Sequence, residues 1–151
     1  MKKFSEILSM DRIRDLDAKD KHDVLEEMVD LMGTSDNIQD RDAFGSAIME
    51  REEILSTGIG FGIAVPHAKV KAVKDFVMAV GRSLQGIEFE SFDHEPVNII
   101  VMIGSSDRQK DDYVRILAKV SRLLKSEENR RAILAAETAQ EIFEVFTRED
   151  S

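Results

Sequence analysis

The sequence predicts an α/β fold with a mixed central β-sheet of about four to five strands and helices on both faces. Apolar residues recur at helical spacing near both ends of the chain, whereas the middle holds short apolar runs of strand length. The run Val97–Ile103 also passes through the turn Gly104–Asp107 into a long amphipathic helix, which is a strand-to-helix unit of the α/β type. At 151 residues, the chain is expected to form a single domain over residues 1–151.

Two helices are predicted in the first third of the chain. The first covers Lys19–Met32, where apolar side chains share one face and Gly33 supplies a stop. The second runs over residues 39–55, and its apolar stripe consists of Phe44, Ala47, Ile48, Ile54 and Leu55. Because a helix turns by about 100° per residue, Arg51 falls near the centre of this stripe. We therefore expect the Arg51 guanidinium to point inward.

Four apolar runs of strand length occupy the middle of the chain. Ile63–Val65 ends at Pro66, which cannot donate to a sheet. Phe76–Val80 is a second run, and Ile87–Phe92 alternates weakly, as expected of an edge strand. Val97–Ile103 is apolar almost throughout, which predicts a strand buried on both faces.

The last third of the chain is predicted to be helical. The long helix after Gly104–Asp107 carries on one face Tyr113, Ile116, Leu117, Val120, Leu123 and Leu124. Ser126, followed by two glutamates, can cap a short helix, and Thr138 with Glu141 forms a capping-box pattern before a final amphipathic segment. These helices complete the layers around the sheet.

The composition excludes several classes of function. A formal net charge of −9 opposes binding to nucleic acid and to anionic lipid, and it favours a basic protein partner. No run of about 20 apolar residues could span a membrane, and early charges such as Glu6 and Asp11 interrupt any secretory signal. The chain has no cysteine, which excludes disulfides and thiolate metal sites. We expect a cytoplasmic protein with no metal, no cofactor and no membrane insertion.

The stretch Gly58–His67, GIGFGIAVPH, is the most informative segment. Its alternating glycines can adopt positive φ angles and expose amides suited to an anion. It is not a P-loop, because no Gly-Lys-Ser/Thr follows, and it is not a dinucleotide fingerprint, because the spacing differs and a strand follows. Nucleotide binding is therefore disfavoured, and the glycines alone fit a tight turn equally well.

His67 suggests a chemical role for this segment, although a structural histidine is the alternative. The strand that ends at Pro66 would present His67 at the rim of the sheet, where open α/β folds place ligand sites. A neutral imidazole, with an ordinary pKa of about 6.5, can accept a phosphoryl group without a metal. An inward Arg51 needs an anionic partner. Two partners are open, a carboxylate of Glu50 or Glu52 and a phosphoryl group on His67.

Residues 51–67, REEILSTGIGFGIAVPH, closely resemble the signature of the fructose/mannitol-type enzyme IIA domains of the bacterial phosphotransferase system, including their nitrogen-type regulatory relatives. The resemblance extends over nearly all of the chain and implies a mixed sheet between helices. It implies that His67 takes a phosphoryl group from the phosphocarrier protein HPr and passes it to a cysteine of a IIB domain, while Arg51 helps to hold the active site. The supporting donors in the matching turn would be Ser56, Thr57, Gly58 and Gly60.

One position departs from the pattern of the family. The family commonly has a second histidine near the start of the long helix, where this sequence has Tyr113. A phenol can donate a hydrogen bond to a phosphoryl oxygen, but with an ordinary pKa near 10 it cannot supply a positive charge. Tyr113 is expected either to bind the phosphoryl group or to be a packed core residue. Weakened transfer would suit an alternative function, a regulatory module whose phosphorylation state gates binding to a target protein.

Several further residues carry weaker expectations. His22 and His94 are expected to be solvated. A short basic run that either meets an acidic partner or is simply solvated consists of Lys69, Lys71 and Lys74. Phe61, between two glycines, is expected to contact HPr or to plug the turn.

Overall fold

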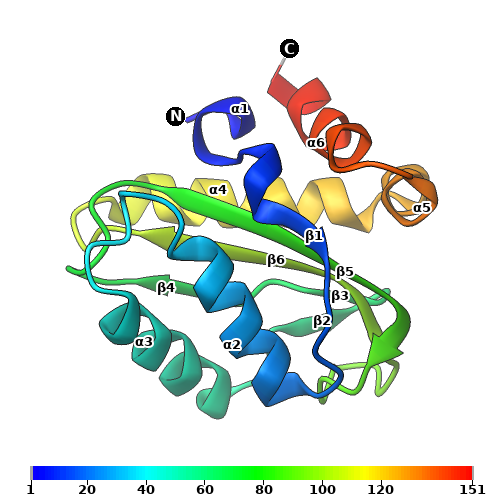
Figure 1. The fold of residues 1–151 in the computed structure, drawn as a ribbon, viewed down its shortest axis with the longest axis horizontal. Helices are drawn as coiled ribbons and strands as arrows, with labels where there is room; N and C mark the ends of the chain where they lie inside the picture. The colour runs from blue at the N-terminus through cyan, green and yellow to red at the C-terminus, as the bar shows by residue number, and fades with distance from the viewer. Residues whose placement is uncertain (1, 151) are drawn as a thin grey trace.

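The computed structural model describes residues 2–150 as a β-sheet between two layers of helices (Figure 1). One face of the sheet is covered by α2 (Lys21–Met32) and α3 (Arg41–Ile54). The remaining helices lie on the other face or close to the chain ends, and they are α1 (Phe4–Ile7), η1 (Met10–Arg12), α4 (Lys110–Lys125), α5 (Glu127–Ala135), α6 (Ala139–Thr147) and η2 (Arg148–Asp150). The predicted α/β class with helices on both faces is confirmed. Between residues 2 and 150, no helix is both long and apolar enough to span a membrane.

The described residues form a sheet of six strands with β6 (Val97–Ser105) near its centre. β5 (Val77–Ile87) pairs with β6 in antiparallel register over most of its length. β1 (Ile13–Asp15) pairs in parallel with the outer edge of β5. The sequence prediction contains β5 only in part, because most residues of its second half are polar or glycine and the strand is exposed at Leu84 and Gln85.

The other edge of β6 is covered by three short strands. β3 (Ile63–Ala64) and β4 (His67–Lys69) both pair with β6 in parallel, one after the other along the strand. β2 (Gly58–Gly60) pairs in antiparallel fashion with β3. The sheet is therefore mixed, as predicted, and β3 lies within the predicted run Ile63–Val65. It has more strands than expected because β1, β2 and β4 are too short to give a periodic sequence pattern.

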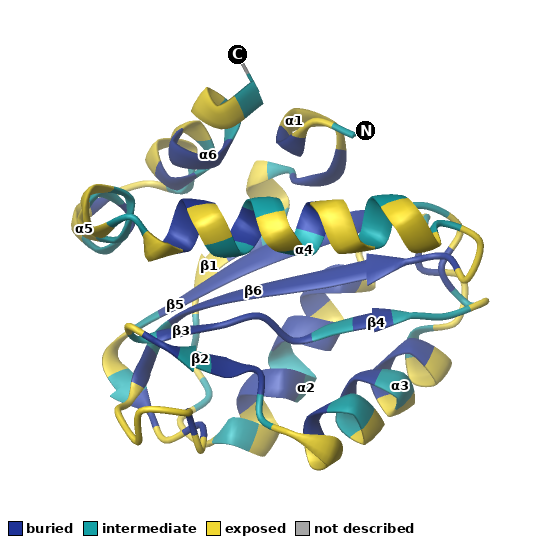
Figure 2. Ribbon diagram, turned by 180° about the vertical axis from the view of Figure 1, so that it is seen from behind, coloured by how far each residue is buried: buried dark blue, intermediate teal, exposed yellow. Residues whose placement is uncertain are grey.

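The two faces of β6 bury two separate apolar clusters. Ile99, Val101 and Ile103 belong to the cluster beneath α4, α5 and α6. Ile100 and Met102 belong to the cluster beneath α2 and α3. All five side chains are at most 1% exposed, and Figure 2 shows the strand buried along its length. β6 is thus buried on both faces, as its apolar sequence predicted.

The predicted helix starts are confirmed where side-chain caps were expected. Ser126 and Thr138 each accept a hydrogen bond from the amide three residues further along the chain. Asp20 and Asp40 cap α2 and α3 in the same way. Such a cap contributes about 1 kcal/mol to stability, so these four residues help to fix where each helix begins.

The predicted strand at Ile87–Phe92 is wrong. Ile87 is the last residue of β5, and the chain then leaves the sheet. Glu90 has a φ of 56°, which is incompatible with an extended strand, and its amide donates to the side chain of Glu88 at 2.9 Å. Phe92 is 88% exposed. Hydrogen bonds between side chains and nearby backbone replace strand pairing here.

A glycine near the end of β6 allows α3 to pack closely against the sheet. A Cβ atom added at Gly104 would lie 2.9 Å from Cε1 of Phe44, which comes from α3. Gly104 also stands opposite Ala68 of β4. The close approach at Gly104 therefore brings α3 beside β4, the strand that carries His67.

Candidate functional site

His67 begins β4 and stands half-buried opposite Ile103 of β6. Its Nδ1 atom lies 2.6 Å from the carbonyl oxygen of Val65. Because a carbonyl oxygen only accepts hydrogen bonds, Nδ1 carries the proton and Nε2 retains its lone pair. Pro66 accepts a hydrogen bond from the Ile103 amide, which fixes the backbone just before the ring. His67 is therefore held in a tautomer that leaves Nε2 free to act as a nucleophile.

The surroundings of His67 lower the pKa of its imidazole below the ordinary value of 6.5. Burial is the largest cause, because it disfavours the charged ring. The hydrogen bond to Val65 opposes that shift, Arg51 adds to it, and Glu52 opposes it. The ring is thus predominantly neutral near pH 7, which is the state that can attack phosphorus.

Arg51 lies in the last turn of α3 and faces the same region. Its Nη1 atom donates to the Leu55 carbonyl oxygen at 2.8 Å. Among residues 2–150, no carboxylate lies within 4.0 Å of the Arg51 guanidinium nitrogens. The alternative of an ion pair with Glu50 or Glu52 is therefore not realised. The positive charge of Arg51 also reaches Tyr113, whose pKa it acts to lower.

The predicted apolar stripe of α3 is wrong at its carboxyl end. Ile54 is 81% exposed and Leu55 is 70% exposed, and Arg51 is only half-buried. The row that does face the core consists of Phe44, Ile48 and Glu52. α3 ends at Ile54, and Leu55 is already extended with a φ of −164°. The last apolar pair is thus exposed at the end of α3, where Ile54 lines the pocket that also contains His67.

Glu52 is a buried residue at the site that sequence reasoning considered only as a partner of Arg51. Its two carboxylate oxygens accept from the amide and the hydroxyl of Thr57, each at 2.7 Å. The ammonium group of Lys21 lies 3.0 Å from the same carboxylate. The position of Glu52 four residues after Ile48, on one helical row with buried residues, is the sequence signal that could have identified it.

The turn residues predicted as phosphoryl donors are engaged elsewhere. Ser56 donates to the carbonyl of Phe89 at 2.8 Å, and its hydroxyl oxygen accepts from the Gly58 amide at 3.1 Å. The donors of Thr57 are held by Glu52. Gly60 has a φ of 97° and faces the Asp93 carboxylate. The structure therefore does not bring Ser56, Thr57, Gly58 or Gly60 into the pocket of His67.

Tyr113 meets His67 from the first turn of α4. The two ring centroids lie 5.8 Å apart at an interplanar angle of 61°. Burial raises the pKa of Tyr113 to about 12, while Arg51 acts in the opposite direction. The phenol is therefore neutral and keeps its proton as a hydrogen-bond donor. Tyr113 also packs against the core beneath α4, which confirms its expected packing role, and its binding of a phosphoryl group stays a prediction.

His67, Arg51 and Tyr113 line one pocket at the free edge of β4. Its volume is about 430 Å³, and the other lining residues are Ala47, Glu50, Ile54, Ala68, Lys69 and Val70. Figure 2 shows β4 lying between α3 and α4, the helices that supply Arg51 and Tyr113. The structure thus gathers three of the seven predicted site residues around one space.

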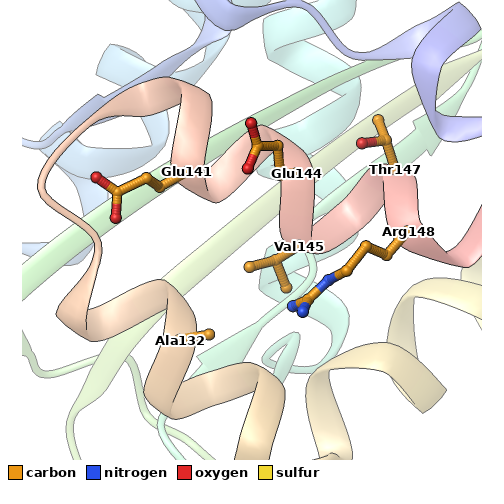
Figure 3. Close-up of a pocket in the computed structure, with 6 residues that line it drawn as sticks. All are labelled: Ala132, Glu141, Glu144, Val145, Thr147 and Arg148. Carbon is orange, nitrogen blue, oxygen red and sulfur yellow. The ribbon is translucent and has the colours of Figure 1, made fainter.

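A second pocket, of about 600 Å³, lies between α5 and α6. Figure 3 shows Val145 of α6 and Arg148 of η2 extending toward Ala132 of α5, with Glu144 pointing away. This pocket has no histidine in its lining and is formed by the helical layer alone. Within the described part of the chain, no cluster of three histidine, aspartate or glutamate residues could hold a metal ion.

The remaining candidates lie outside the pocket of His67, apart from Lys69. His22 and His94 are exposed, as predicted. Lys71 and Lys74 are exposed as well, whereas Lys69 is half-buried. The ring of Phe61 is 60% exposed and lies 5.0 Å from Cζ of Arg130, so it does not plug the turn.

Comparison with known proteins gives consistent matches. The family model for the phosphoenolpyruvate-dependent sugar phosphotransferase system, EIIA 2, matches residues 6–149. The PTS system fructose-specific EIIABC component of Bacillus subtilis is 36% identical over 149 residues, which make up 98% of this chain and 24% of that protein. The PTS system fructose-specific EIIA component of Haloferax volcanii is 38% identical over 125 residues, or 83% of this chain and 81% of that protein.

A solved structure shares the fold. The crystal structure of Nitrogen Regulatory Protein IIA-Ntr from Neisseria meningitidis superposes with a TM-score of 0.88 at 24% identity, covering 94% of this chain and 97% of that chain. The shared fold and the histidine site define a phosphotransferase that works through a histidine. This chain belongs to the EIIA 2 family of the phosphoenolpyruvate-dependent sugar phosphotransferase system. It spans about a quarter of the Bacillus relative.

Proposed function

We propose that this chain is a cytoplasmic phosphocarrier that accepts a phosphoryl group from HPr on Nε2 of His67 and passes it to a cysteine of a IIB component. The observation that carries the proposal is the hydrogen bond from Nδ1 to Val65, which leaves the lone pair of Nε2 free. Arg51 lines the same pocket, and no carboxylate between residues 2 and 150 lies within 4.0 Å of its guanidinium nitrogens. The family and its fructose-specific relatives support the same reaction.

Transfer of the phosphoryl group needs no cofactor, because one P–N bond forms as another breaks. The Nε2 lone pair of His67 attacks phosphorus in the donor phosphohistidine, and the donor P–N bond breaks as the new P–N bond forms. The donor imidazole leaves with the electron pair of the broken bond. The proton remains on Nδ1 of His67, so the ring gains a positive charge that the Val65 carbonyl oxygen stabilises. Attack by a thiolate of the IIB component then returns His67 to its neutral form.

In this proposal, Arg51 and Tyr113 bind the oxygens of the transferred group. Nη1 of Arg51 is bonded to Leu55, which orients the guanidinium and leaves its other N–H groups for phosphoryl oxygens. The Tyr113 hydroxyl adds a neutral donor from the opposite helix. Donors fixed before the reaction stabilise the developing charge more effectively than mobile water does.

A large partner can reach the nucleophile because the rim of the pocket is apolar and exposed. Ile54 lines the pocket and is 81% exposed, and the adjacent Leu55 is 70% exposed. Val114, next to Tyr113 on α4, is 62% exposed. Exposed apolar side chains around a polar centre suit transient docking of another protein. We assign HPr and the IIB component to this rim in turn.

The relatives also guide the choice of transport partner. The Bacillus relative is an EIIABC component and both sequence relatives are fructose-specific by name. A IIB component of a fructose system is therefore the acceptor to test first.

A second candidate function is a regulatory module whose phosphorylation state gates binding to a target protein. The neutral Tyr113 favours it, because a phenol with a pKa of about 12 supplies no positive charge to the phosphoryl group. The likeness in fold to a nitrogen regulatory protein supports it as well. Both functions require phosphorylation of His67. They differ in the protein that binds the phosphorylated surface, which is a IIB component in transport and a target protein in regulation.

Labelling with phosphorylated HPr tests the phosphocarrier proposal. We expect an acid-labile, base-stable label on wild type and none on His67→Ala. His94→Ala should be labelled as wild type, because that residue is exposed and does not line the pocket of His67. Arg51→Ala is expected to slow labelling about a hundredfold, whereas Arg115→Ala, an exposed arginine on α4, is expected to have no effect. Equal labelling of wild type and His67→Ala eliminates the proposal.

Two measurements separate transport from regulation. Transport predicts that labelled protein passes its phosphoryl group to a fructose IIB component, and that a sugar permease is encoded nearby. Regulation predicts a target protein that binds wild type and His67→Asp differently. A pull-down in which the set of partners is identical for both forms counts against regulation.

A further inference from the structure

We propose that Lys69 is a second phosphoryl-binding cation: its ammonium group, carried on the same face of β4 as His67, contacts oxygens of the phosphoryl group on Nε2. This inference rests on the proposed function of His67. It assigns to Lys69 a catalytic role that neither the signature stretch nor the family match specifies, because Lys69 lies two residues beyond the end of that stretch.

Strand geometry places the two side chains together. Residues i and i+2 of a strand point to the same face, and the residue between them, Ala68, is buried in the cluster beneath α2 and α3. His67 and Lys69 therefore point away from that cluster, toward α4. Both residues line the same pocket.

Lys69 is unusual among the lysines of residues 2–150 because it is partly buried and no described carboxylate lies within 4.0 Å of its ammonium group. Within residues 2–150, the lysines that are not fully exposed are Lys2, Lys21, Lys69 and Lys119. Three of these have a carboxylate within 4.0 Å, at 3.3 Å for Lys2, 3.0 Å for Lys21 and 3.5 Å for Lys119. Lys69 has none. A partly buried lysine side chain with no counter-ion favours the binding of an anion at its ammonium group.

Tyr113 holds the ammonium group of Lys69 near the nucleophile. Nζ of Lys69 lies 5.6 Å from the centroid of the Tyr113 ring, within the range of a cation–π contact. The same ring lies 5.8 Å from the His67 ring, centroid to centroid. Tyr113 therefore borders both groups, and although its own hydroxyl is neutral it keeps a cation at the site.

The balance of charges in the pocket favours a second cation. Arg51, Lys69 and Glu50 are the charged residues that line it. Glu50 would offset Arg51 alone, whereas Arg51 and Lys69 together leave the pocket positive. A phosphoryl group carries between one and two negative charges near pH 7. The pocket volume of about 430 Å³ is more than ten times the roughly 30 Å³ of a water molecule in the liquid, which leaves room for the phosphoryl group between these side chains.

The test compares two phosphoryl donors on a set of lysine variants. Potassium phosphoramidate is small and needs no docking surface, whereas phosphorylated HPr needs one. Lys69→Met is expected to slow the formation of phosphohistidine about tenfold or more with both donors. Lys69→Arg keeps the charge and is expected to recover most of the rate. Lys71→Met, which removes an exposed lysine of the same segment, is expected to match wild type.

The outcomes are distinguishable by phosphorus NMR and by labelling rates. A Lys69→Met protein that equals wild type with phosphoramidate overturns the inference, whether or not its rate with HPr falls, because an effect confined to HPr belongs to docking. An equal loss in Lys69→Met and Lys69→Arg also overturns it, since the charge would then be irrelevant. If wild type itself forms no phosphohistidine with either donor, the proposed function fails instead. Thermal unfolding of each variant, with Lys69→Gln as a second neutral form, confirms that the compared proteins are folded.

Discussion

The carboxylate of Glu52 accepts hydrogen bonds from both the amide and the hydroxyl of Thr57, each at 2.7 Å. The connection continues toward the nucleophile, because the carbonyl of Thr57 accepts from the Val65 amide at 3.1 Å and the carbonyl of Val65 contacts Nδ1 of His67. Lys21 pairs with the same carboxylate at 3.0 Å. One buried carboxylate thus supports the backbone that selects the tautomer of His67.

Replacement of Glu52 is expected to destabilise the fold. Glu52→Ala leaves two donors of Thr57 without an acceptor and removes the nearest partner of Lys21, so we expect the free energy of unfolding to fall by about 2–4 kcal/mol. Urea unfolding measures this change in the free energy of unfolding. Glu53→Ala, at an exposed neighbouring position, is expected to stay within about 0.5 kcal/mol of wild type. A Glu52→Ala protein as stable as wild type would show that this buried network contributes nothing.

Acidification is expected to destabilise the protein through His67. The pKa of His67 is lowered in the folded state, first by burial, so below about pH 6.5 the unfolded chain binds more protons than the folded chain. The free energy of unfolding therefore falls as the pH drops from 6.5 through the lower folded-state pKa. Urea unfolding should show a smaller acid loss for His67→Gln than for wild type. In NMR, the titration midpoint of the His67 ring should lie below 6.5, and a midpoint above that value contradicts the burial argument.

The hydroxyl and the ring of Tyr113 are expected to contribute differently. Tyr113→Phe keeps the ring that contacts His67 and Lys69, so labelling by phosphoramidate should slow only a few-fold, as for loss of one neutral hydrogen bond. Tyr113→Leu removes the aromatic face as well, and a larger loss is expected. Comparison of the labelling rates of the two variants separates the contribution of the hydroxyl from that of the aromatic ring. Equal rates would assign the whole effect to the hydroxyl.

A methyl group at Gly104 is expected to disturb both stability and the site. The added Cβ would lie 2.9 Å from Cε1 of Phe44, and overpacking of this kind costs about 1–3 kcal/mol. Gly33→Ala is the matched control, because its Cβ would meet the flexible Cγ of Arg41 at 3.3 Å. Thermal unfolding compares the two. Because Gly104 pairs with Ala68, we also expect slower labelling of His67 in Gly104→Ala. A normal labelling rate would show that packing at Gly104 does not affect the phosphorylation of His67.

Much of the fold follows from sequence periodicity and capping residues. α2 and α4 repeat apolar residues over three or more turns, and β6 is apolar on both faces, so local pattern and tertiary environment agree. The sequence predictions are wrong where contacts with distant parts of the chain determine whether a residue is buried. Ile54 and Leu55 are apolar, yet both are exposed at the end of α3. The local pattern of a helix does not show whether a neighbouring element covers its last turn.

The nucleophile of the candidate site could be predicted from the sequence, but the contacts of the residues around it could not. His67 is marked by Pro66 and by the strand before it, but the partners of the glycine turn depend on the loop that contains Asp93, more than thirty residues away. The pairing of Glu52 with Lys21 likewise joins two helices. Lys69 could be recognised only once the absence of a nearby carboxylate among residues 2–150 was known from the structure.

The two ends of the described chain are fastened to each other. The side chain of Asp150 accepts hydrogen bonds from the amides of Phe4 and Ser5, at 2.7 and 3.0 Å, and Figure 1 shows both ends on the side of the sheet that α4 covers. A short peptide could therefore bridge them, and the chain could be reopened in the exposed loop that contains Phe92. Such a circular permutant would keep the arrangement of the strands beside β4 in space. It should therefore still accept a phosphoryl group, although its segments follow one another in a different order along the chain.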